Sequence, residues 1–151
     1  MPMTASTIGT YNFSYLDGTK GSDSFIGGTG NDTFVGQAGG DSLTGDGGAN
    51  IYKYLATTDS PPGTASFDII SDFIHGMDKI DFSAIAGLTA VESATSAPPM
   101  IAAHTIEIVT AGGNTIIYAN ATSVAEAPAA ADMEVHLTGV TNLTSSDILH
   151  P

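Results

Sequence analysis

The chain has 151 residues, enough for one compact domain or one repeat array with a cap. Sixteen acidic residues stand against three lysines and no arginine, so the formal net charge is −13. This charge excludes nucleic acid and anionic membranes as partners and favours cations. There is also no cysteine for a disulfide framework, and no apolar stretch approaches the roughly 18 residues of a membrane span.

The N-terminal residues 1–10 show no pattern, and residues 11–16 predict a strand that covers the start of the segment that follows. The N-terminus lacks the basic and apolar regions of a cleavable signal peptide, so export would need a route that does not use one.

From Gly18 the chain repeats every nine residues, as GTKGSDSFI, GGTGNDTFV, GQAGGDSLT and GDGGANIYK. Glycine at positions one and four allows backbone φ > 0, so the first six residues can form a tight turn. The last three residues form a short strand whose apolar residue at position eight points inward. Eighteen residues therefore complete one coil of two parallel sheets, with Phe25 stacked on Leu43 and Phe34 on Tyr52.

Position six of the repeat is aspartate in three units and asparagine in the fourth, and its side chains stack between consecutive coils. Strands lie about 4.7–4.9 Å apart, which is about twice the 2.3–2.6 Å between calcium and its oxygen ligands. The repeat therefore predicts about two to four calcium ions, with magnesium a poorer fit. A flexible linker would not carry this periodicity, and a phosphate-binding loop would need a lysine and a following helix.

The predicted metal ligands are the side chains at position six and the main-chain carbonyls of the turns. The side chains are Asp23, Asp32, Asp41 and Asn50, where asparagine offers a neutral oxygen and lower affinity. The turn residues are Gly18, Lys20, Gly21, Gly27, Thr29, Gly30, Gly36, Ala38, Gly39, Gly45, Gly47 and Gly48.

Beyond the repeats, residues 54–62 (YLATTDSPP) are predicted as a degenerate fifth unit with Asp59 stacked above Asp41. The alternative is that Asp59 only begins a turn. Residues 67–85 predict two strands joined at residues 75–76. Asp68 and Asp72 are further candidate calcium ligands, and a capping or surface role for them stays open.

The C-terminal part is predicted as an antiparallel β cap on the open end of the coils. Residues 86–100 are expected to be a loop, residues 104–120 a hairpin and residues 123–132 a linker or turn. Residues 133–140 predict another strand, followed by a turn that begins at Thr144. The fold class is therefore all-β, a parallel β-roll capped by antiparallel strands. It forms one domain over 1–151, divided into 1–17, 18–59 and 60–151.

The nonapeptide resembles the GGxGxDxUx repeat of the repeats-in-toxin (RTX) class, and GGTGNDTFV matches it fully. Residues 67–85 resemble the segment after the roll in serralysin-type metalloprotease C-terminal domains and in the R-modules of alginate epimerases. The resemblance implies a secreted, extracellular calcium-binding protein that is exported unfolded by type I secretion machinery, with its signal at the C-terminal end.

No zinc-type histidine spacing, nucleophile motif or cysteine is present, so the expectation is a non-enzymatic calcium module. The alternative is an accessory carbohydrate-binding module, as the resemblance to R-modules implies. Three scattered lysines leave a neutral glycan as its possible ligand.

Overall fold

The computed structural model describes residues 6–7 and 13–151, so part of the predicted strand 11–16 lies outside the described residues. The N-terminal strands are β1 (Ser6–Thr7), β2 (Phe13–Asp17), β3 (Ser24–Gly28), β4 (Asn31–Val35), β5 (Ser42–Asp46), β6 (Ile51–Lys53), β7 (Asp68–Ile70) and β8 (Lys79–Asp81). The C-terminal strands are β9 (Ala90–Ala94), β10 (Thr105–Ala111), β11 (Asn114–Asn120), β12 (Met133–Leu137) and β13 (Ile148–Leu149). Three 3₁₀ turns accompany them: η1 (Thr57–Asp59), η2 (Pro128–Ala130) and η3 (Ser145–Asp147). None of the helices in this described part of the chain is long and apolar enough to cross a membrane.

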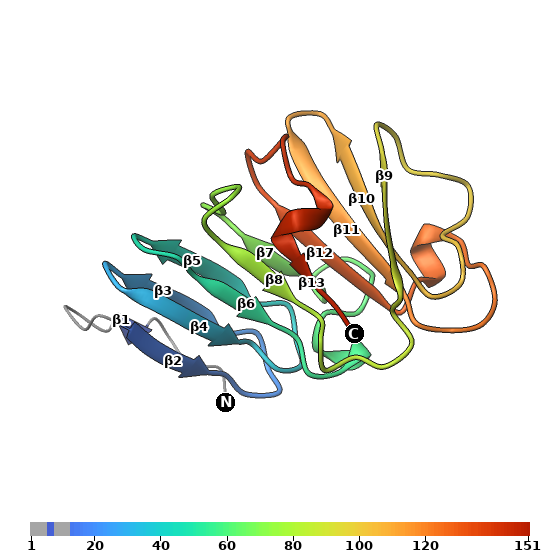
Figure 1. Cartoon of the computed structure of the whole chain (residues 1–151). Coiled ribbons are helices and arrows are strands. Elements are labelled where there is room, and N and C mark those ends of the chain that lie inside the picture. The colour runs from blue at the N-terminus through green and yellow to red at the C-terminus, as the bar shows by residue number, and fades with distance from the viewer. Residues whose placement is uncertain (1–5, 8–12) are drawn as a thin grey trace.

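The repeats form the predicted roll, with successive strands in two opposing sheets (Figure 1). The 18-residue register is confirmed, because Phe25 pairs with Leu43 and Phe34 pairs with Tyr52 in parallel ladders. The rings of Phe34 and Tyr52 stack with their centroids 5.1 Å apart, and both side chains are fully buried. The predicted N-terminal strand is present as β2, which pairs with β4 over Phe13–Asp17.

The prediction that residues 54–62 form a fifth unit is wrong, because β5 pairs with β7 instead. In that unit Pro61 would occupy position eight, where a strand needs a backbone N–H that proline lacks. Asp59 lies in η1, where its Oδ2 accepts the N–H groups of Leu55 (2.8 Å) and Ala56 (3.0 Å). The chain therefore skips nine residues, and Ile70 takes the buried position above Leu43.

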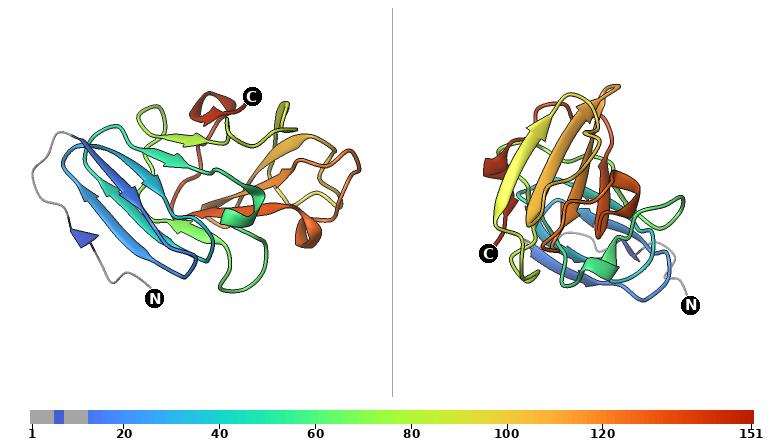
Figure 2. Two further views of the ribbon diagram at one scale, coloured as in Figure 1. Left: turned by 90° about the horizontal axis from the view of Figure 1, so that it is seen from below. Right: turned by 90° about the vertical axis from the view of Figure 1, so that its right-hand side faces the viewer.

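The cap continues one sheet of the roll without a break (Figures 1 and 2). The strand order in this sheet is β1-β3-β5-β7-β12-β11-β10-β9, and β12 joins β7 in parallel. The predicted hairpin is confirmed as β10 and β11, which turn at Gly112 and Gly113 with φ of 61° and 83°. Both sheets contribute to one hydrophobic cluster that runs from Leu16 to Ile148 and covers the open end of the roll.

The expected loop 86–100 contains the strand β9, which differs from the prediction. β9 pairs in parallel with β10 over five residues at the edge of the sheet. Val91 packs against the core, but the other side chains are small or charged and none is fully buried, so the alternating pattern that marks a half-buried strand is missing. Main-chain hydrogen bonding to β10 therefore defines β9, and side-chain burial contributes little.

The C-terminal turn closes the second sheet, whose order is β13-β8-β6-β4-β2. Asp147 is fully buried and accepts the N–H groups of Thr144 (2.9 Å) and Gly76 (3.0 Å). The Nδ1 atom of His75 lies 2.7 Å from Asp147 Oδ2, the oxygen that also accepts the Thr144 N–H. Burial would raise the pKa of Asp147, but these hydrogen bonds and the His75 ring outweigh it and lower the pKa. Asp147 therefore fastens the C-terminal turn to the loop between β7 and β8.

Candidate metal centre

The residues at position six form two files of buried side chains, one on each edge of the roll. The first file contains Asp23, Asp41 and Asp68, and the second file contains Asp32, Asn50 and Asp78. Each file is connected by hydrogen bonds from a backbone N–H to the side-chain oxygen of the next coil, at 2.8–2.9 Å. The predicted stacking of Asp23 with Asp41 is confirmed, whereas metal binding by these residues stays a prediction.

Asp68, and not Asp59, is the residue that follows Asp41 in the first file. The Asp41 N–H donates to Asp68 Oδ1 at 2.8 Å, as the Asp23 N–H donates to Asp41 Oδ1. Asp59 is buried beside the file, and its charge contributes to raising the pKa values of Asp41 and Asp68. Asp59 thus adds a third negative charge near this end of the file from outside the stack.

Several carboxylate oxygens in the files have no hydrogen-bond donor although they are buried. They are both oxygens of Asp32 and the Oδ2 atom of Asp41, whereas the Asp68 carboxylate interacts with the Tyr54 hydroxyl, which lowers the pKa of Asp68 against the larger effect of burial. Burial raises the pKa of Asp41 to about 7 and that of Asp68 to about 8. A buried anion without a partner is unfavourable, so these groups require either a proton or a cation.

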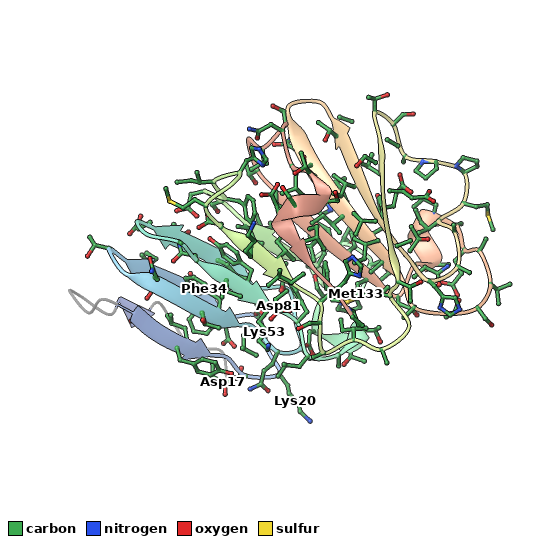
Figure 3. All side chains as sticks on the ribbon, viewed as in Figure 1. Asp17, Lys20, Phe34, Lys53, Asp81 and Met133 are labelled. Atoms are coloured by element: carbon green, nitrogen blue, oxygen red, sulfur yellow. The ribbon has the colours of Figure 1, made fainter. Side chains whose placement is uncertain are left out.

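The lysines do not supply that cation. Lys53 Nζ pairs with Asp81 Oδ2 at 2.9 Å, and Lys79 Nζ donates to the Ser146 carbonyl at 2.7 Å. The Lys20 side chain is exposed and points away from the ribbon, whereas Lys53 lies beside Asp81 (Figure 3). Since the sequence has no arginine, neither lysine nor arginine side chains balance the charge of the files.

The glycines at position one are explained by the side chains at position six. A Cβ atom on Gly18 would lie 2.8 Å from Asp23 Oδ2, and one on Gly36 would collide with Asp41 Oδ2. The prediction that position one uses positive φ is therefore wrong, because the space rather than the backbone conformation requires glycine there. Positive φ occurs at position two and at part of position four: Gly28, Gln37, Asp46, Gly39 and Gly48.

Asp72 and Asp78 follow the roll and already have hydrogen-bond donors. Asp72 accepts the N–H of Gly45 at Oδ1 (2.8 Å) and that of Asp46 at Oδ2 (2.7 Å). These bonds support the capping role that the sequence left open for Asp72. Asp78 accepts the N–H of Asn50 (2.8 Å) and belongs to the second file, which the sequence analysis missed. The signal was available, since Asp78 precedes the buried Ile80 by two residues, as Asp32 precedes Phe34.

Within residues 6–7 and 13–151, no group of three or more His, Cys, Asp or Glu side chains is arranged to hold a metal ion. Neighbouring members of the first file supply two carboxylates, and those of the second file supply one carboxylate and the Asn50 amide, so a bound ion would need carbonyl oxygens from the turns as well. Among those carbonyls, that of Gly18 accepts the Gln37 amide at 3.0 Å and that of Gly47 accepts the Asn50 amide at 3.3 Å.

These features define the chain as a repeat-built parallel β-roll with acidic files on its edges. Residues 9–150 match the family described as "Peptidase M10 serralysin C terminal", and the chain belongs to this family. No curated protein matches the chain.

Two solved structures that are similar to this chain are subunits of the mannuronan C5-epimerase of Azotobacter vinelandii. The solution structure of AlgE6R2 is 24% identical, covers 96% of this chain and 92% of its own, and superimposes with a TM-score of 0.58. The solution structure of AlgE6R3 is 26% identical to this chain, and the match covers 91% of this chain and 77% of AlgE6R3, with a TM-score of 0.47. The AlgE6R2 likeness confirms the all-β roll fold, and with the family match it confirms the resemblance seen in the sequence.

Proposed function

We propose that the chain is a calcium-binding module that folds when it meets calcium outside the cell. The observation that carries this proposal is the first file, in which Asp41 buries one oxygen with no donor between the buried carboxylates of Asp23 and Asp68. A divalent cation between consecutive coils would neutralise two carboxylates at once and replace the missing donors. In the proposed sites the carboxylates are supplied by Asp23, Asp41, Asp68 and, on the other edge, Asp32.

Calcium is the cation that suits these ligands. The donors in the files are carboxylate and carbonyl oxygens, which calcium binds in flexible geometry at about 2.3–2.6 Å. Magnesium demands a tighter octahedron and retains water, so a spacing set by strands about 4.7–4.9 Å apart suits it poorly. All four histidines interact elsewhere, with Asp147, Gly87, Glu134 and Pro151.

Folding is coupled to calcium in this proposal. Without metal, the carboxylates of each file repel one another and the glycine turns lose the most chain entropy on folding. Calcium that binds only the folded state stabilises it by about 2.7 kcal/mol per ion at a concentration a hundredfold above Kd. The roll is therefore unfolded at the low calcium of a cytosol and folded at extracellular calcium.

The proposal includes export through type I secretion machinery, with the signal in residues 133–151. Met133 and Leu137 are fully buried in β12, which lies between β7 and β11. A receptor could therefore read this segment only in the unfolded chain. Calcium-dependent folding after export would keep the signal accessible inside the cell.

We assign the chain no catalytic role. Asp68 and Asp78 belong to the files, and Asp72 and Asp81 have partners of their own among the backbone N–H groups and Lys53. The second interpretation, a carbohydrate-binding accessory module, stays a prediction, to be tested on a glycan array in the presence of calcium.

Calcium titration into chelator-treated protein tests the proposal. The β signal in far-ultraviolet circular dichroism should rise with calcium, and magnesium at the same concentration should not replace it. A spectrum that is unchanged by chelator would contradict coupled folding. Calorimetry on the same sample would then show whether calcium binds at all.

A further inference from the structure

Asp41 and Asn50 hold equivalent positions in the two files, and one of their side-chain contacts is the same. Asp41 Oδ1 accepts the N–H of Asp23 at 2.8 Å, and Asn50 Oδ1 accepts the N–H of Asp32 at 2.9 Å. In each case the donor precedes the acceptor by 18 residues, and both side chains are only 2% exposed. The two residues therefore differ in only one side-chain atom, a carboxylate oxygen in Asp41 and an amide nitrogen in Asn50.

The hydrogen bond from Asp32 determines which way the Asn50 amide is turned. An N–H group needs an acceptor, so the amide oxygen must face Asp32 and the amide nitrogen must face the opposite way. There the nitrogen donates to the carbonyl of Gly47, 3.3 Å away, within its own turn. A Cβ atom on Gly45 would collide with this nitrogen, which shows that the amide fills the space inside the turn.

The consequences for the turns that contain Asp41 and Asn50 are opposite. In the first file, Asp41 Oδ2 is buried without a donor, and the charge needs a cation. In the turn 45–50, the amide carries no charge and its nitrogen donates to a carbonyl that a cation would otherwise coordinate. The Asn50 N–H donates to Asp78, whose other oxygen accepts the N–H of Ile74, so this end of the second file is hydrogen-bonded without metal.

We propose that the Asn50 amide takes the place of a calcium ion, so that the turn 45–50 closes without metal. This proposal rests on the proposed calcium binding and reverses the expectation that Asn50 is a weak ligand. Calcium then binds only at sites that do not use Asn50, chiefly along the first file. The end of the roll that joins β8 is then held by hydrogen bonds alone, and it needs no ion of its own when calcium at the other sites folds the roll.

Two variants of Asn50 distinguish an amide that replaces an ion from an amide that binds one. In isothermal calorimetry, Asn50→Ala should bind as many calcium ions as the wild type, because no ligand is lost. Asn50→Asp should bind one more ion, because it restores the charged oxygen that Asp41 has. Asn31→Asp is the matched control, since Asn31 is exposed, lies on the same edge and accepts the N–H of Ala49 at 2.7 Å. It adds the same charge and should leave the ion count unchanged.

Loss of one ion in Asn50→Ala would overturn the inference while leaving calcium binding intact. An unchanged count in a folded Asn50→Asp, or an equal gain in Asn31→Asp, would overturn it as well. If Asn50→Asp does not fold in calcium, the count for Asn50→Ala decides. A wild type that binds no calcium would instead refute the proposed function, and the inference with it.

Discussion

Replacing Asp41 by asparagine should change the stability of the roll in opposite directions with and without calcium. In calcium the variant loses a charged ligand of the first file. Losing one ion is expected to cost about 3 kcal/mol at a calcium concentration a hundredfold above Kd. Without calcium the variant removes a buried charge, and its new amide can donate to the carbonyl of Ala38, as Asn50 donates to that of Gly47.

The gain without calcium follows from the pKa of Asp41. Burial raises this pKa from 3.8 to about 7, a difference of about three units or about 4 kcal/mol at 1.36 kcal/mol per unit. We halve this figure because solvent partly screens the charge, which leaves about 2 kcal/mol. Since the folded state holds this proton more tightly than the unfolded state, calcium-free wild type gains stability as the pH falls from about 8 towards 4. The advantage of Asp41→Asn should therefore be present at pH 8 and disappear near pH 4.

Urea unfolding followed by circular dichroism, in chelator and in calcium, measures both effects. Where the calcium-free chain is already unfolded, the residual β signal at pH 8 replaces the urea midpoint. Asp72→Asn is the control, because it weakens a cap made by two backbone N–H groups and should lower stability in both conditions with no change in ion count. If Asp41→Asn were as harmful in chelator as in calcium, Asp41 would be a structural hydrogen-bond acceptor only, and the reasoning would fail.

Three further predictions concern the core, the C-terminal turn and export. Phe34→Ala should lower the free energy of unfolding in calcium by about 3–5 kcal/mol, because it leaves a cavity in the core. Tyr15→Ala removes an exposed ring and should change this free energy by less than about 0.5 kcal/mol. Urea unfolding midpoints measure both effects. Asp147→Asn should lower the free energy of unfolding by about 2 kcal/mol at pH 7. Because the pKa of Asp147 is lowered in the folded state, this loss should fade as the pH drops below about 4. An equal loss at pH 3 would show that the ionised form of Asp147 is not what stabilises the turn. Deleting residues 133–151 should abolish secretion from cells with a type I system, as assayed in the culture medium, and continued secretion would show that the signal lies elsewhere.

The repeats could be predicted from the sequence because each column has a local cause. Phe25, Phe34, Leu43 and Tyr52 recur where the strand must face inward, and their register follows directly from the period. The prediction of a fifth unit from Asp59 was wrong, because a single acidic residue in phase does not ensure a strand. Pro61 at position eight was the contrary signal.

The parts that the sequence did not predict depend on contacts between distant segments. β12 pairs with β7 although Val135 and Asp68 lie far apart in the chain, and no local sequence pattern predicts that pairing. β9 likewise owes its existence to the neighbouring β10. The candidate site was predicted as a set of stacked residues, but the membership of Asp78 and the opposite behaviour of Asn50 required the hydrogen bonds to be seen.

The nine extra residues between β6 and β7 show that coils of different length can keep the same strand register in this roll. From Asp23 to Asp41 the chain takes 18 residues, and from Asp41 to Asp68 it takes 27, yet both steps end in the same hydrogen bond of 2.8 Å. Loop-closure entropy changes slowly with length, so the longer step costs only about 0.4 kcal/mol more. Residues 63–65 at the outer end of the long step are exposed, and the backbone at Gly63 has open space around it. A peptide inserted at residues 63–65 should therefore extend into solvent and leave the hydrogen-bonded ladders of the two neighbouring coils in place.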